Sequence, residues 1–88
     1  MQQLDGRKMT FAPVRIRDRS GPRLLVRVVR NVRAASDVML EWPGRGSAWR
    51  TAAEVISEAL YGRETPEAAR AAFLAAAEEA GVLMVDVD

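Results

Sequence analysis

The first half of the chain alternates apolar and charged residues, which is the pattern of a half-buried β-strand. Residues 14–19 read Val-Arg-Ile-Arg-Asp-Arg, so Val14 and Ile16 are expected to face the interior. The turn-forming segment Ser20-Gly21-Pro22 separates this strand from a second apolar-rich run over residues 23–29. Together the two runs predict a β-hairpin.

The second predicted strand has apolar residues on both of its faces, because successive side chains of a strand point in opposite directions. We assign to the interior Leu24, Val26 and Val28. We assign to the outer face Arg23, Leu25, Arg27 and Val29. The outer face is therefore predicted to be partly basic and partly apolar.

Helical spacing of apolar residues begins after Asn31, a residue type that often caps helices, and Pro43 ends this first predicted helix at about Trp42. Ser47 is the predicted cap of a second helix over residues 48–61.

A third helix is predicted to start at Thr65-Pro66-Glu67, which combines a capping hydroxyl, a proline in the first turn and an acid where the helix dipole favours it. It is expected to run to about Ala80 and to end at Gly81. Residues 82–87 alternate again and predict a last strand.

These elements predict an α+β fold with a three-stranded antiparallel or mixed sheet and three helices on one face, in the order β-β-α-α-α-β. Residues 11–88 are expected to form a single domain, and residues 1–10, which show no periodicity, a flexible N-terminal tail. A chain of 88 residues with much alanine has a thin core, so we expect it to complete its burial as a homo-oligomer, in the simplest case a homodimer.

The composition argues against several kinds of chemistry. The chain has neither cysteine nor histidine, which removes thiol nucleophiles, imidazole bases and the usual zinc ligands. Four glutamates lie on helix faces expected to be exposed, without a nucleophile, and are interpreted as solvated surface: Glu54, Glu58, Glu78 and Glu79. We therefore expect no enzyme activity, no cofactor and no metal.

The start of the chain lacks the apolar run of a signal peptide, and no stretch approaches the roughly 20 apolar residues of a membrane span. A cytoplasmic location without a membrane partner is expected.

Charge is unevenly distributed along the chain. Residues 1–33 have nine basic and two acidic side chains, whereas the remainder has four basic and ten acidic ones. This asymmetry indicates either a nucleic-acid surface or two halves that complement each other in the fold. If the last strand lies beside the first, Asp86 and Asp88 would partly neutralise the basic strip.

Two surfaces are candidate contact sites. The predicted dimer or basic sheet face consists of Arg15, Arg17, Leu25, Arg27, Val29 and Met84. Its arginines suit a phosphate backbone, but it has no aromatic stacking platform, so nucleic acid is the less favoured partner. The predicted partner contact consists of Trp42, Pro43, Arg45, Trp49 and Arg70.

The alternative for the two tryptophans is that they anchor the helices to the sheet. The alternatives for Arg70 are a fork that binds a carboxylate or phosphate, a pair with an acid of its own chain, or a stem that covers apolar surface.

The combined pattern also carries a resemblance. Its residues are Pro13-Val14, Trp42-Pro43, Gly46, Trp49, Ala52, Ala59-Leu60, Gly62, Pro66-Glu67, Ala69-Arg70, Phe73, Ala76 and Ala80-Gly81. It resembles a family of small alphaproteobacterial proteins catalogued as domain of unknown function 982, over nearly the whole chain from about residue 11. The resemblance implies a short α+β domain with no assigned activity or cofactor.

Taken together, the sequence predicts a small interaction or regulatory module that is homodimeric, with an unknown protein as a candidate further partner. The alternative is a nucleic-acid accessory protein that contacts the phosphate backbone through the arginine-rich sheet face.

Overall fold

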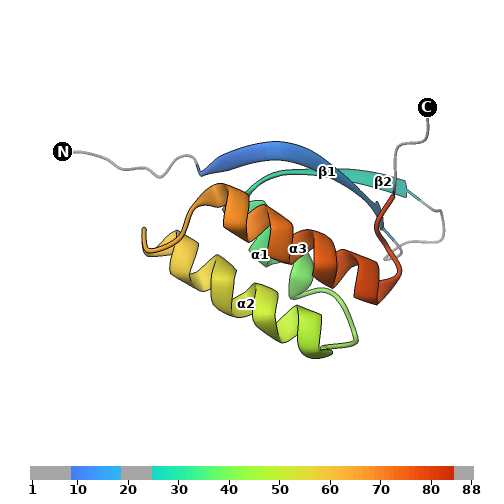
Figure 1. The fold of residues 1–88 in the computed structure, drawn as a ribbon. Coiled ribbons are helices and arrows are strands. Elements are labelled where there is room, and N and C mark those ends of the chain that lie inside the picture. The colour runs from blue at the N-terminus through green and yellow to red at the C-terminus, as the bar shows by residue number, and fades with distance from the viewer. Residues whose placement is uncertain (1–8, 19–24, 85–88) are drawn as a thin grey trace.

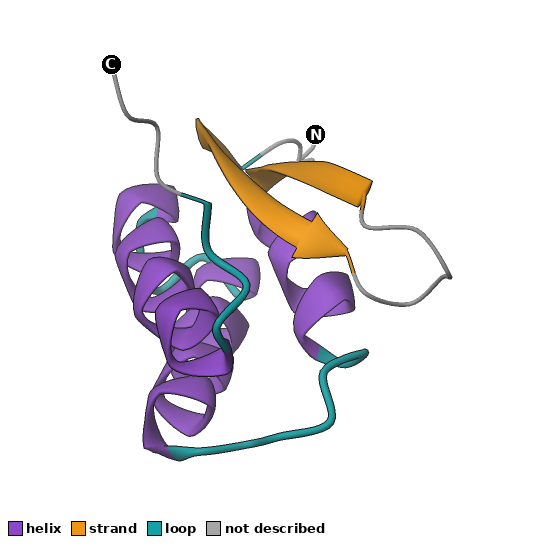
Figure 2. Cartoon of the chain, turned by 90° about the vertical axis from the view of Figure 1, so that its right-hand side faces the viewer, coloured by secondary structure: helices purple, strands orange, loops and turns teal. Residues whose placement is uncertain are grey.

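The computed structural model describes residues 9–18 and 25–84. Its elements in chain order are β1 (Thr10–Asp18), β2 (Leu25–Asn31), α1 (Val32–Met39), α2 (Ser47–Leu60) and α3 (Pro66–Ala80). The two strands pair antiparallel, and the three helices lie on one face of the sheet (Figure 1, Figure 2). α1 and α3 pack against the strands, and α2 packs against these two helices on the side away from the sheet. The predicted α+β fold is confirmed.

The predicted third strand is reduced to one bridge in the described part of the chain. Leu83 pairs antiparallel with Ile16 of β1. The flanking backbone hydrogen bonds run from the Arg17 N–H to the Val82 carbonyl (2.8 Å) and from the Met84 N–H to the Arg15 carbonyl (3.0 Å). The segment therefore lies beside the first strand, while residues 85–88, with Asp86 and Asp88, lie outside the described residues.

The register of the hairpin reverses the predicted faces of β2. Val14 lies opposite Val29, and both are buried. Val26 and Val28 are 53% and 41% exposed, whereas Val29 is 1% exposed. Because β2 has apolar residues in both alternating sets, its own pattern could not decide which set faces the core, and the pairing with β1 decides it.

We call the solvent-facing side of the sheet the outer sheet face. Alternation from the buried Val14, Ile16 and Val29 places on it Arg15, Arg17, Val26, Val28 and Arg30, all of them exposed. The register sets Val28 opposite Arg15 and Val26 opposite Arg17. Two rows of arginine and valine therefore cross this face.

Most helix ends follow the predicted signals. The Asn31 side chain accepts a hydrogen bond from the Ala34 N–H (2.7 Å), and the Thr65 hydroxyl accepts one from the Ala68 N–H (3.0 Å). Gly81 ends α3 with a φ of 75°, a left-handed conformation that suits glycine. α1 ends at Met39, earlier than predicted, because a turn leads into the corner.

β1 begins at Thr10, inside the predicted tail, and the preceding Met9 carbonyl accepts a hydrogen bond from the Val32 N–H (3.0 Å). Residues 1–8 lie outside the described part of the chain. The core lies between the sheet and the helices, and its largest fully buried side chains are Phe73, Ile16, Met39, Val29 and Val32.

Candidate functional site

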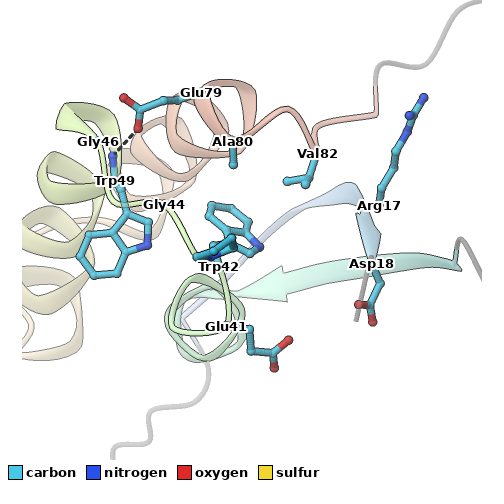
Figure 3. Close-up of a pocket in the computed structure, with 11 residues that line it drawn as sticks. Arg17, Asp18, Glu41, Trp42, Gly44, Gly46, Trp49, Glu79, Ala80 and Val82 are labelled. Carbon is cyan, nitrogen blue, oxygen red and sulfur yellow. Dashed lines mark hydrogen bonds between the residues drawn. The ribbon is translucent and has the colours of Figure 1, made fainter. Parts of the chain in front are cut away.

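A cavity of about 530 Å³ lies at the predicted Trp42–Trp49 corner (Figure 3). Its walls come from the α1–α2 connection, the end of α3 and the end of β1. The lining residues are Arg17, Asp18, Glu41, Trp42, Pro43, Gly44, Gly46, Trp49, Glu79, Ala80 and Val82. The fold thus brings three segments distant in sequence together around the corner.

Both tryptophans hold the corner in place and also line the cavity. Trp42 is buried and stacks on Phe73 of α3, with ring centroids 5.8 Å apart and planes 24° apart. Trp49 is half-buried, and its ring N–H donates to the Met39 carbonyl at the end of α1 (2.9 Å). Both rings therefore tie helices together, and the role of the two residues as a partner contact stays a prediction.

The other two predicted corner residues are exposed and differ in position. Pro43 lines the cavity, whereas Arg45 folds over Trp49, with its guanidinium carbon 4.5 Å from the centroid of the indole ring. This cation–π contact covers part of Trp49 from solvent. Arg45 is therefore a cover for the tryptophan and is not among the residues that line the cavity.

Glu79 closes the corner by capping α2. Its carboxylate accepts hydrogen bonds from the Ala48 N–H (3.2 Å) and the Trp49 N–H (3.0 Å). The N-cap residue is Gly46, which has no side chain to do this, and a Cβ atom there would collide with the Glu79 carboxylate. A negative charge is favourable at a helix N-terminus.

The predicted cap Ser47 is wrong, whereas Glu79 is exposed as predicted and in addition caps α2. Ser47 is the first residue of the helix, and the capping group comes from another helix. No local sequence pattern signals such a cap, because the two N–H groups that Glu79 accepts from lie 31 and 30 residues before it in the chain.

The remaining carboxylates at the rim are held by Arg27. Its guanidinium lies 2.9 Å from Glu41 and 3.6 Å from Asp18. Arg27 was predicted on the outer face, but the register places it on the same side as the buried Val29, from which it reaches the rim. The cavity therefore combines apolar walls with a charged rim, in which the three carboxylates are engaged as described and Arg17 is the one lining residue with a positive charge.

Arg70, the fifth predicted contact residue, does not join the corner. Its Nε–H donates to the Ala12 carbonyl (2.7 Å), in the stretch of β1 where the register with β2 shifts. A bulge leaves backbone groups without a ladder partner, and Arg70 satisfies one of them. The prediction of an anion site or an intramolecular ion pair at Arg70 is therefore replaced by a bond that ties α3 to β1.

The predicted basic sheet face is divided between the two sides of the sheet. Arg15 and Arg17 lie on the outer sheet face as predicted, whereas Arg27 and the buried Val29 lie on the helix side, together with Leu25 at the strand end. Met84 is half-buried beside β1. Val26 and Val28 take the places on the outer sheet face that the prediction gave to Leu25 and Val29.

A family model described as a protein of unknown function, DUF982, matches residues 13–84, which is most of the chain. The chain belongs to the DUF982 family. The matched range of this DUF982 protein spans β2, all three helices, most of β1 and the residues of the corner cavity. Comparison with curated proteins and with solved structures finds no significant match. The alphaproteobacterial origin stays a prediction.

Neither α1, α2 nor α3 has the length and apolar character needed to cross a membrane. The described side chains also include no group of three or more acidic, histidine or cysteine residues that could hold a metal ion.

Proposed function

We propose that this DUF982 protein is a homodimeric, non-catalytic interaction module that holds an apolar side chain of a partner protein in the corner cavity. The observation on which the proposal rests is the cavity itself. Its volume of about 530 Å³ falls in the range of ligand pockets, and its walls include Trp42, Trp49 and Val82. Indole walls beside an exposed proline suit a protein contact, where tryptophan is enriched.

The state of the three rim carboxylates favours an apolar side chain over a small cationic ligand. Sites for polar ligands use a few convergent polar groups to fix orientation. Here Glu79 is engaged by the N-terminus of α2, and Arg27 engages both Glu41 and Asp18. Recognition would therefore depend on the shape and apolar character of the walls. The lack of histidine and cysteine supports a role without catalysis.

The test uses small amides as probes of single side chains. We expect N-acetyl-tryptophanamide or N-acetyl-leucinamide, but not N-acetyl-glycinamide, to shift the indole N–H resonances of Trp42 and Trp49 in NMR titrations. Ala80→Leu extends a side chain from a residue that lines the cavity and should abolish these shifts. Ala75→Leu, at an exposed position of α3 outside the cavity, is the matched control and should preserve them. Equal responses to all three amides, or equal loss in both variants, would refute the cavity as a contact site.

A second candidate function is supported by the outer sheet face. Arg15, Arg17 and Arg30 are exposed there and could contact a phosphate backbone, although the described residues of this face include no aromatic ring for base stacking. This function predicts salt-dependent binding of mixed-sequence single-stranded RNA or DNA, measured by fluorescence anisotropy, that Arg15→Glu with Arg17→Glu removes. Absence of binding at low ionic strength would eliminate it.

A further inference from the structure

β1 and β2 differ in how their edges are used. β1 has β2 on one side and the Val82–Met84 segment on the other, joined by the Ile16–Leu83 bridge. Among the described residues, β2 has a strand neighbour on one side only. Within the described ranges, the other edge of β2 is therefore an open strand edge.

The residues of β2 that present backbone groups at this edge follow from the hydrogen bonds of β1. The Arg15 carbonyl and the Arg17 N–H form hydrogen bonds with the Val82–Met84 segment, so both residues direct their backbone groups away from β2. Because the direction alternates along a strand, Ile16 directs its groups toward β2, where its partner is Arg27. The residues of β2 that direct their N–H and C=O groups away from β1 are therefore Val26, Val28 and Arg30.

Apolar side chains of β2 are exposed along this edge, beside one exposed charge, Arg30. Leu25, Val26 and Val28 are 52%, 53% and 41% exposed. Open edges are usually protected by charges, proline, bulges or shortness. β2 is seven residues long, and its register with β1 is regular from Leu25 to Val29. The edge has the length and the apolar side chains of a pairing surface.

We propose that the edge of β2 pairs antiparallel with β2 of a second copy of the chain, about a twofold axis at Val28. This register sets Leu25 opposite Asn31, so all seven residues of each strand are paired. The outward backbone groups of Val26, Val28 and Arg30 then all meet partners. The result is a continuous four-stranded sheet with the order β1-β2-β2-β1, which gives the homodimer of the proposed function a defined interface.

The charges of β2 are compatible with a second copy as the occupant and favour this register over its neighbour. With the axis at Val28, Arg30 lies opposite Val26 and Arg27 lies opposite Val29, so no two guanidinium groups face each other directly. With the axis at Arg27, each Arg27 would face its own copy, and like charges directly opposite are unfavourable. The axis at Val28 also brings the exposed valines of both copies to the centre of the outer sheet face.

Proline at position 28 tests the pairing at its centre. The Val28 N–H points away from β1, so Val28→Pro removes an intermolecular donor and leaves the β1–β2 ladder intact. Val28→Thr keeps both the N–H and the β-branched shape and is the matched control. We expect sedimentation equilibrium at micromolar concentrations to give twice the chain mass of 9.7 kDa for the natural chain and for Val28→Thr, and the single mass for Val28→Pro.

A monomeric natural chain, or a dimeric Val28→Pro chain with native circular dichroism, would overturn the proposal. If Val28→Pro does not fold, Val28→Lys provides the second test, because lysine is tolerated at an exposed strand position but sets two ammonium groups together at the axis. A folded Val28→Lys chain that remains dimeric would also overturn it. The amide titration of the corner cavity can be repeated on the monomeric variant, so failure of the dimer and failure of the cavity are distinguishable.

Discussion

The α2–α3 pair and the β1–β2 pair are both antiparallel hairpins, but among the described residues only the β-hairpin has a strand edge without a neighbour. α2 and α3 approach each other through small buried side chains: Ala52, Ala59, Ala69, Ala76 and Ala77. The Thr65 hydroxyl caps α3, and the Glu79 carboxylate caps α2. The β-hairpin buries one face under the helices and leaves valines exposed on the other face and along the open edge of β2.

This difference supports the proposal that the sheet edge meets a second copy of the chain. The helical pair has a side-chain cap at the start of each helix, and its exposed apolar residues, Leu60 (41%) and Tyr61 (72%), lie at the C-terminal end of α2. The sheet has both apolar side chains and backbone groups that a neighbour could cover. Variants in the two regions should therefore separate the stability of the fold from the assembly of the protein.

The largest effect is expected at Phe73, where the helical pair meets the rest of the core. Phe73 is fully buried and supports the ring of Trp42. Phe73→Ala should lower the free energy of unfolding by about 3–5 kcal/mol, measured by urea denaturation, because it removes buried apolar surface and leaves a cavity. A loss below about 1 kcal/mol would mean that the corner is not anchored through this ring.

The same substitution on the two faces of β2 sharpens the comparison. In the Val28→Pro background, where dimerisation does not contribute, Val29→Thr should lower the free energy of unfolding by about 1–3 kcal/mol, because it buries a hydroxyl group. Val26→Thr should change it by less than about 0.5 kcal/mol, because Val26 is exposed. A larger loss of unfolding free energy for Val26→Thr than for Val29→Thr would mean that Val26 faces the core, as the sequence predicted.

A smaller effect is expected at the cap that α3 provides for α2. Glu79→Ala should cost about 1 kcal/mol of unfolding free energy, the usual value for loss of a helix cap. Glu78→Ala, at the exposed neighbouring position, is the control and should be close to neutral. Equal effects of the two substitutions would show that the carboxylate does not stabilise the start of α2 in solution.

The sequence predicted the parts of the fold that local signals determine. Asn31, Thr65 and Gly81 mark helix ends through bonds or conformations within a few residues, and the structure confirms all three. The faces of β2 were wrong because Leu25 and Val29 compete with Val26 and Val28 for the interior, and only the pairing with β1 selects between the two sets.

The candidate site was predictable only in part for the same physical reason. Trp42, Pro43 and Trp49 were identified because they lie within one short segment of the sequence. Glu79 was missed because its capping role depends on how α3 packs against α2, and Arg70 was misplaced because its partner is the Ala12 carbonyl, 58 residues away. Long-range contacts of this kind leave no pattern in the residues around them.

Amide hydrogen exchange along β2, followed by NMR in the natural chain, tests most directly whether a second copy completes the sheet. The account predicts that Arg27 and Val29, which bond to β1, are protected at all concentrations at which the chain is folded. Val26, Val28 and Arg30 should be protected at concentrations where the chain is dimeric and should lose protection on dilution. If the amides of Val26, Val28 and Arg30 exchange rapidly even in the most concentrated samples, the pairing of β2 with a second copy is contradicted.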